Sequence, residues 1–150
     1  MAELNSDTAV KASGRQVRVS PKAAREVCAA VKGLELDAAK AFLEQVAQKK
    51  QAVPYRRYNK TVPHRRGLLK TAAGRYPVKA AKKILRVIEG AEANALFKGL
   101  DVDQLKVVHA AAYPGMKIKR YTPRAMGRAS PRFETLCHIE IVLEQTGGKT

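Results

Sequence analysis

The chain has 150 residues, which suits one domain with a modest core, and carries 29 Lys and Arg against 13 Asp and Glu for a formal net charge of +16. Because the cations are clustered rather than spread, the charge favours a polyanionic partner over a merely basic surface. A membrane surface is a weaker alternative, since no stretch is apolar over the length of a span and no amphipathic segment pairs cations with Trp or Phe.

The N-terminal region predicts a tail followed by a strand. Residues 1–14 have neither the basic start nor the apolar core of a signal peptide, and we expect a flexible tail. From Arg15 to Val19 polar and apolar residues alternate, which predicts a short half-buried strand. Cys28 and Cys137 lack metal-ligand spacing and are expected to be buried, reduced thiols, in keeping with a cytoplasmic protein.

Two amphipathic helices follow. Ser20 is placed to cap the first helix and Pro21 occupies its first position, where the missing N–H costs nothing. Apolar residues then recur at helical spacing until Gly33, which is placed to end the helix. The same spacing predicts a second helix from Asp37 to Lys50, with lysines at its C-terminus. The apolar residues of both helices are interpreted as core.

Residues 49–77 form a basic insertion. No acidic residue occurs between Glu44 and Glu89, and tyrosines interleave with the cations. This mixture favours a surface that contacts phosphates and stacks on unpaired bases; the alternative is a solvated, flexible insertion with incidental charge. The residues of the insertion predicted to contact RNA are Arg56, Arg57, Tyr58, Lys60, Arg65, Arg66 and Arg75.

A third helix is predicted from Val78 to Gly99, where apolar residues again follow the helical period. Lys79, Lys82 and Lys83 lie on the opposite side of this helix and continue the acid-free run. A solvated charged face would explain any one of them, but their clustering favours RNA contact.

The last feature is a long hairpin. Strands are predicted at 105–112 and 134–144, and residues 113–132 between them hold six cations and no carboxylate. Hairpin loops are normally two to five residues. Because this connection also lacks large aliphatic residues, we expect it to be mobile alone and ordered by a phosphate backbone. The residues of the connection predicted to contact RNA are Lys117, Lys119, Arg120, Tyr121, Arg124, Arg128 and Arg132.

These elements predict an α+β fold in which three helices pack on a small three-stranded antiparallel sheet with a long protruding β-hairpin. One RNA-binding domain would span 15–144, with a flexible C-terminal tail at 145–150. Gly115 and Gly127 are expected to allow close approach of the arm backbone to RNA.

Catalytic and metal-binding signals are absent from the sequence. His64, His109 and His138 belong to no recognised motif, and the basic stretches have no carboxylate to act as a base. We therefore expect no enzyme, cofactor or metal. Cations on a loop, a helix face and a hairpin suit an irregular folded RNA better than a straight duplex. An independent nucleic-acid-binding regulator and an RNA-processing enzyme are the alternatives.

The segment Lys119–Ala129 (KRYTPRAMGRA), followed by Cys137–Glu140 (CHIE), resembles the large-subunit ribosomal protein family called L twenty-two in bacteria. The resemblance covers 15–144. The insertion, with PYRRYNK from Pro54 and GRYP from Gly74, resembles the archaeal and eukaryotic branch, called L seventeen in eukaryotes.

The resemblance implies a structural constituent of the large ribosomal subunit in the cytoplasm. It implies binding to large-subunit (23S-type) rRNA, a contribution to assembly, and contacts with neighbouring ribosomal proteins and the nascent polypeptide; neither a membrane nor a homo-oligomer is expected. His138 on the return strand would contact rRNA. The arm tip would line the polypeptide exit tunnel through Arg124, Ala125, Met126, Gly127, Arg128 and Ala129. Met126 departs from relatives that carry a basic residue or histidine there.

Overall fold

The structure is a computed structural model that describes residues 8–68 and 71–146. Its elements, in chain order, are β1 (Ala9–Val17), α1 (Pro21–Val31), α2 (Leu36–Ala47), β2 (Val53–Pro54), β3 (Gly74–Arg75), α3 (Val78–Phe97), the 3-10 helix η1 (Val102–Gln104), β4 (Leu105–Ile118), β5 (Tyr121–Pro123), β6 (Ala129–Pro131) and β7 (Glu134–Gln145). The predicted α+β fold, with three helices, a three-stranded sheet and a long hairpin, is confirmed.

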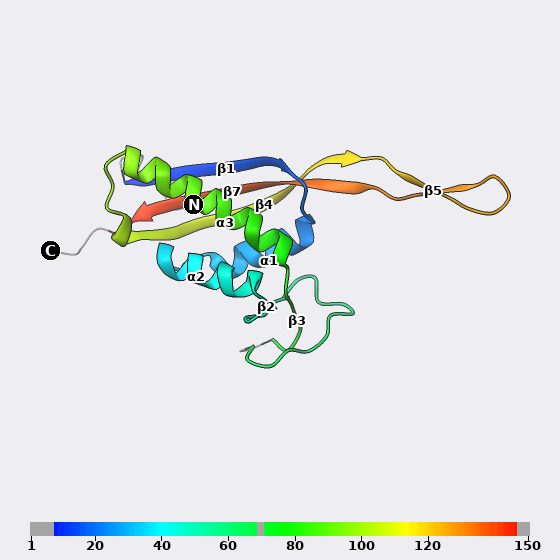
Figure 1. Cartoon of the computed structure of the whole chain (residues 1–150), viewed down its shortest axis with the longest axis horizontal. Coiled ribbons are helices and arrows are strands. Elements are labelled where there is room, and N and C mark those ends of the chain that lie inside the picture. The colour runs from blue at the N-terminus through cyan, green and yellow to red at the C-terminus, as the bar shows by residue number, and fades with distance from the viewer. Residues whose placement is uncertain (1–7, 69–70, 147–150) are drawn as a thin grey trace.

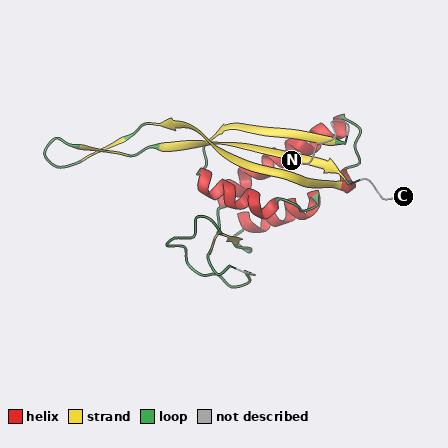
Figure 2. Ribbon diagram, turned by 180° about the vertical axis from the view of Figure 1, so that it is seen from behind, coloured by secondary structure: helices red, strands yellow, loops and turns green. Residues whose placement is uncertain are grey.

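The main sheet is antiparallel and has the order β1-β7-β4. Alternate residues of the central strand point to one face, so that Cys137, Ile139, Ile141 and Leu143 are all completely buried. The three helices cover this face, and the view from behind shows the sheet in front of them (Figure 2). The helix-covered side predicted from the alternation in β7 is therefore the core.

Helix α1 begins and ends as its sequence predicts. Pro21 is its first residue, although the Ser20 side chain makes no capping hydrogen bond. Gly33 has φ +89°, a left-handed conformation that favours glycine, and its N–H donates to the Val107 carbonyl at 2.8 Å. The end of α1 is thereby tied to β4. Helix α2 begins at Leu36, one residue before the predicted start.

The first strand is longer than the sequence indicated. It begins at Ala9 rather than Arg15, and Ala9 to Gly14 pair with β7, so residues 9–14 are strand and not tail. The alternation is invisible there because Ala12, Ser13 and Gly14 are small and give little hydropathy contrast. Strand β7 likewise extends to Gln145. Residues 1–7 and 147–150 lie outside the described residues.

The connection at 113–132 is itself mostly strand. Strand β4 continues to Ile118 beside β7, and beyond it β5 pairs with β6. The two antiparallel halves of this hairpin project from the end of the sheet as a narrow arm (Figure 1). The strand was predicted to end at Ala112, because the alternation of apolar and polar residues stops there and charged residues follow. Backbone pairing continues without that alternation, since both faces of the arm are open.

The basic insertion lies on the far side of the helices from the sheet (Figure 1). Its two ends are joined by the short antiparallel pair β2 and β3. Val53 and Tyr55 at its start are buried in the core, which fixes where the insertion leaves the globule. In the described part of the chain, no helix has the length and hydropathy needed to cross a bilayer.

Candidate nucleic-acid interface

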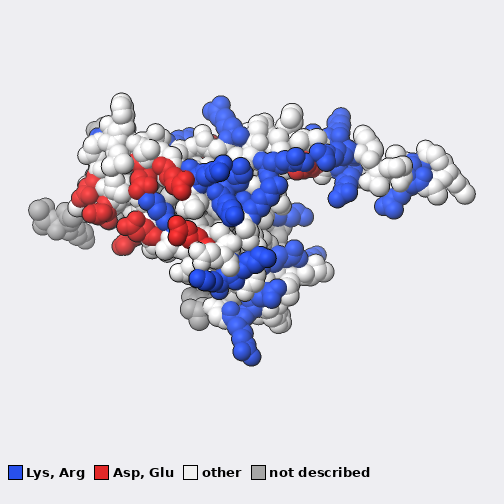
Figure 3. Space-filling model, viewed as in Figure 1, with Lys and Arg blue, Asp and Glu red and all other residues white. Residues whose placement is uncertain are grey.

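The two signs of charge occupy different parts of the surface. Acidic side chains gather at the end of the globule where the C-terminus lies, whereas Lys and Arg extend over the centre, the insertion and the arm (Figure 3). This segregation produces a continuous positive field on one side, which attracts a polyanion more strongly than the same charges dispersed would.

The insertion is anchored by a single buried carboxylate. Glu26 on α1 is 3% exposed. It accepts hydrogen bonds from the backbone N–H groups of Arg56, Arg57 and Tyr58 at 3.0–3.1 Å. Both arginine side chains remain exposed while their backbone is held. Glu26 therefore fixes the start of the insertion and directs its first two guanidinium groups outward.

The tyrosines of the insertion are in contact with cations of the same chain. Lys22 Nζ lies 5.6 Å from the centre of the Tyr58 ring, and Arg57 Cζ lies 6.0 Å from it. Arg65 Cζ lies 5.3 Å from the ring of Tyr76. These cation–π contacts hold charge beside aromatic faces, an arrangement suited to both phosphate and base contact.

Most of the predicted RNA-contacting cations are exposed. In the insertion and α3 the exposed ones are Arg56, Arg57, Lys60, Arg65, Arg66, Arg75, Lys79 and Lys82, whereas Tyr58 and Lys83 are half-buried. In the arm the exposed residues are Lys117, Lys119, Arg120, Tyr121, Arg124, Arg128 and Arg132. The predicted residues thus form two separate groups, joined through the first turns of α1 and the start of α3.

Local contacts help to shape the arm beyond the main sheet. The rings of Tyr121 and Phe133 meet edge to face with their centres 6.0 Å apart. At the tip, the Arg124 N–H donates to the Arg128 carbonyl at 2.8 Å. Met126 and Gly127 between them have positive φ values of 57° and 66°. All six residues of the predicted tip, 124–129, are exposed.

His138 and Gly115 lie at the junction of the arm with β1, apart from the exposed cations. The half-buried His138 accepts a hydrogen bond at Nδ1 from the Gln16 N–H at 3.4 Å. A Cβ on Gly115 would lie 2.8 Å from Gln16 Oε1 and 3.0 Å from His138 Nε2. Close approach of RNA to Gly115 stays a prediction; the structure shows that side chains of the same chain fill the space that a Cβ would occupy there.

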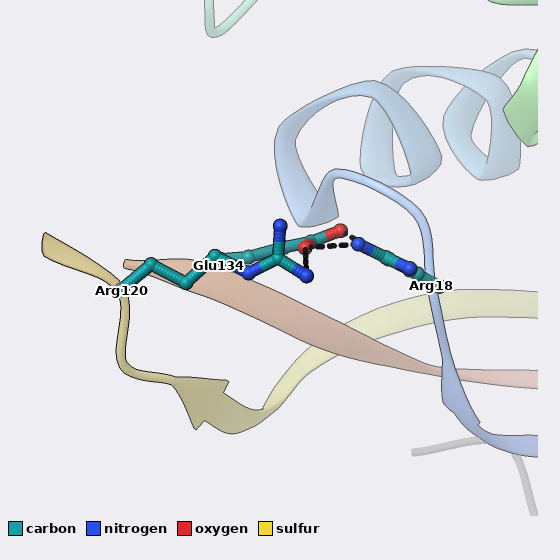
Figure 4. Close-up of polar contacts among 3 residues, drawn as sticks. All are labelled: Arg18, Arg120 and Glu134. Carbon is teal, nitrogen blue, oxygen red and sulfur yellow. Dashed lines mark hydrogen bonds and ion pairs between the residues drawn. The ribbon is translucent and has the colours of Figure 1, made fainter. Parts of the chain in front are cut away.

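An ion-pair cluster joins the globule to the arm (Figure 4). Arg18, in the β1–α1 connection, donates from Nε and Nη2 to the two Glu134 oxygens at 2.7 and 2.8 Å. Arg120 of the arm lies 3.9 Å from the same carboxylate. The hydrogen bond from Arg18 lowers the pKa of Glu134 against a smaller opposing effect of burial, and it raises the pKa of Arg18. All three groups are accessible to water, so the cluster orients the arm more than it stabilises the fold.

The two cysteines are buried free thiols, as predicted. Burial, with a smaller effect of Cys137, raises the pKa of Cys28 to about 12, so the thiol stays protonated and unreactive at neutral pH. Within residues 8–68 and 71–146, no three His, Cys, Asp or Glu side chains cluster in a way that could hold a metal ion.

Comparison with known proteins identifies the family. Residues 12–144 match the family described as Ribosomal protein L22p/L17e. The chain belongs to this family. It is 51% identical over 144 residues to the Large ribosomal subunit protein uL22 of Methanopyrus kandleri, covering 95% of this chain and 91% of that protein.

Two further L22p/L17e relatives carry the same name. The protein of Ignicoccus hospitalis is 47% identical over 148 residues, covering 97% of this chain and 93% of the relative. That of Archaeoglobus fulgidus is 51% identical over 136 residues, covering 91% and 88%. The resemblance to the archaeal branch is confirmed. L22p/L17e proteins are structural components of the large ribosomal subunit in the cytoplasm, so the prediction of a non-enzymatic ribosomal protein is also confirmed.

Sequence reasoning missed four charged residues that shape this surface of the L22p/L17e chain. Glu26 was not singled out, because a lone carboxylate on a helix gives no sign of which backbone it will meet. Arg18, Lys22 and Arg25 were not singled out, because they alternate with apolar residues that were interpreted as core. One signal in the sequence pointed to such a contact. The insertion has no carboxylate of its own, so an acidic residue that accepts hydrogen bonds from its backbone N–H groups must come from elsewhere in the chain.

Proposed function

We propose that this chain binds large-subunit rRNA, contributes to assembly of the subunit, and lines the polypeptide exit tunnel with the tip of its arm. The observation that carries the proposal is the arm. It is rich in exposed cations and contains no carboxylate from 113 to 132, and none of the core residues comes from it. Such a segment gains most of its stabilisation from an external polyanion.

The insertion and the α3 face support the same partner. The insertion presents guanidinium groups on a backbone held by Glu26, with aromatic rings beside them. The lysines of α3 face away from its buried side, which packs on the sheet. Cations on surfaces of different orientation match the several helices and loops of a folded RNA, and they need not read sequence to bind it.

The tip supports a role beside the nascent polypeptide. Met126 is 94% exposed at the far end of the arm, between Arg124 and Arg128. The neutral, flexible thioether of Met126 can make apolar contacts with nascent polypeptides of many different sequences. The neighbouring ribosomal proteins would contact the globule rather than the tip.

Binding can be tested with an in vitro transcript of archaeal large-subunit rRNA in filter-binding assays across a salt series. The logarithm of the association constant should fall with the logarithm of salt concentration by roughly 0.7–0.9 per phosphate neutralised. The variant Arg124→Gln/Arg128→Gln should reduce that slope. A salt-independent affinity would refute electrostatic rRNA binding.

The tunnel role needs assembled subunits. A photo-reactive amino acid at position 126 should cross-link to a stalled nascent chain in reconstituted ribosomes, and the same group at position 101, on the acidic end of the globule, should not. Equal cross-linking from both positions, or none from 126, would contradict the assignment of the tip to the tunnel.

A further inference from the structure

The base of the arm contains a hollow of about 720 Å³ that lies between the two predicted groups of RNA-contacting residues and takes lining residues from both. It is bounded by the β1–α1 connection, the first turns of α1, the start of α3 and both strands of the arm. The charged residues that line it are Arg18, Lys22, Arg25, Lys79, Lys117 and Glu134. We call this site the junction hollow.

The junction hollow has a strong excess of positive charge. Its five cations are exposed, and its single carboxylate, Glu134, is already hydrogen-bonded to Arg18. The first turn of α1, which lines the hollow through Pro21 and Lys22, contains no acidic residue, so the positive end of the helix dipole adds to the field. Cations held this close repel one another, and an anion placed among them removes that cost.

The junction hollow shares lining residues with a hollow on either side of it. One of about 630 Å³ on the insertion shares Lys22 and Tyr58 with it and adds Lys60 and Arg75. Another of about 480 Å³ along the arm shares Phe133 and Glu134. The three hollows therefore follow one another from the insertion, past the start of α1, to the arm.

We propose that the junction hollow binds the phosphodiester backbone of an RNA strand that passes from the insertion onto the arm. The inference rests on the proposed rRNA binding and adds a site to it: the insertion and the arm form one track for a single strand. Lys22, Arg25 and Lys117 contact phosphates, and Glu134 holds Arg18 at the edge of the track. Tyr58 and Phe133 stand at its two ends, where unpaired bases can stack on them.

A pair of matched variants tests the site. Lys22→Gln/Lys117→Gln removes two lysines from the junction hollow, one in the first turn of α1 and one on β4. Lys32→Gln/Lys106→Gln removes two lysines from the opposite ends of the same two elements, where both line a different hollow that includes Glu144. All four side chains are exposed, so both proteins should fold, and thermal melts monitored by circular dichroism check that they do.

The two variants have the same net charge but should differ in binding to the rRNA transcript. Loss of two phosphate contacts corresponds to roughly a 25- to 60-fold weaker affinity at 0.1 M salt and a salt slope smaller by about 1.4–1.8. The control pair should lose about twofold or less, because its lysines line a different hollow at the opposite ends of α1 and β4, where salt screens their effect on the track. Arg25→Gln alone should give about half the slope change of the first pair.

The outcomes separate this inference from the function on which it rests. If the wild-type protein fails to bind the transcript, both the proposed rRNA binding and the proposed site in the junction hollow are refuted. If it binds and the two lysine pairs weaken affinity equally, rRNA binding stands and the junction hollow is not a site. Replacing chloride with inorganic phosphate at equal ionic strength should leave the difference between the pairs intact; its disappearance would assign the hollow to a free anion and overturn the proposal.

Discussion

The globule and the arm share the same two strands, yet they are stabilised in different ways. Within the globule, Val107 of β4 and Leu143 of β7 face each other under the helices and are completely buried. Farther along the same hairpin, Met116 is 59% exposed and Tyr121 61% exposed. Strand pairing with a few ring and polar contacts therefore gives the arm its shape, whereas apolar burial gives the globule its stability.

The insertion is intermediate between these two regions. It carries exposed cations like the arm, but its start is packed in the core through Tyr55 and its backbone is bound by Glu26. A buried carboxylate with three N–H donors is an efficient anchor, since hydrogen bonds to a charged group are stronger than neutral ones. The insertion is thus a basic surface that the globule itself orders, whereas the arm is a basic surface that we expect its partner to order.

The largest difference between the regions should appear on truncating apolar residues. Leu43→Ala, at a completely buried position of α2, should lower the free energy of unfolding by about 2–5 kcal/mol, because it leaves a cavity. Met116→Ala in the arm should change it by less than about 0.5 kcal/mol. Urea denaturation of both variants measures this, and equal losses would mean that the arm has a core of its own.

The next largest effect should come from the anchor of the insertion. Glu26→Ala leaves three backbone N–H groups without their acceptor and should cost about 1.5–3 kcal/mol. Limited proteolysis should then cut the insertion faster. Glu26→Gln keeps one acceptor oxygen and should fall between wild type and alanine, while Glu89→Ala, at an exposed glutamate, serves as the control. An insertion that stays protected in Glu26→Ala would show that other contacts order it.

A smaller difference concerns motion without any change in folding. In the free protein, heteronuclear relaxation should show residues 113–132 moving on the nanosecond scale, most of all at the tip, while β7 within the sheet stays rigid. Addition of the rRNA transcript should order the arm. An arm as rigid as the globule in the absence of RNA would refute its dependence on a partner.

The smallest effect should be seen at the ion pair between the two regions. Because Arg18 lowers the pKa of Glu134 below its ordinary value of 4.5, the pair contributes above that value and its contribution disappears as pH falls through the lowered pKa. NMR titration of the carboxyl group should report the shift, and Arg18→Gln should return the pKa toward 4.5. Stability near pH 7 should hardly change, as expected for a pair accessible to water. An unchanged Glu134 pKa in Arg18→Gln would exclude the pairing.

Much of the candidate interface was predictable because charge depends on composition. The acid-free run through the insertion, the lysines on the outer face of α3 and the cations of the arm were all identified before any contact was known. Residues whose roles depend on a distant partner were not. The contact of His138 with rRNA stays a prediction, but the hydrogen bond that its Nδ1 accepts from the Gln16 N–H of β1 could not be expected from the sequence.

The sequence by itself determined the local elements, the apolar face of each and the sign of the surface, because these depend on residues close together in the chain. Only the tertiary structure decided that Ala9 joins the sheet, that Glu26 binds the insertion, and that Arg18, Lys22 and Lys117 surround one hollow. Such contacts join residues between 30 and 135 positions apart. Folding brings them together by burying the core between them, and no local pattern records which distant groups will meet.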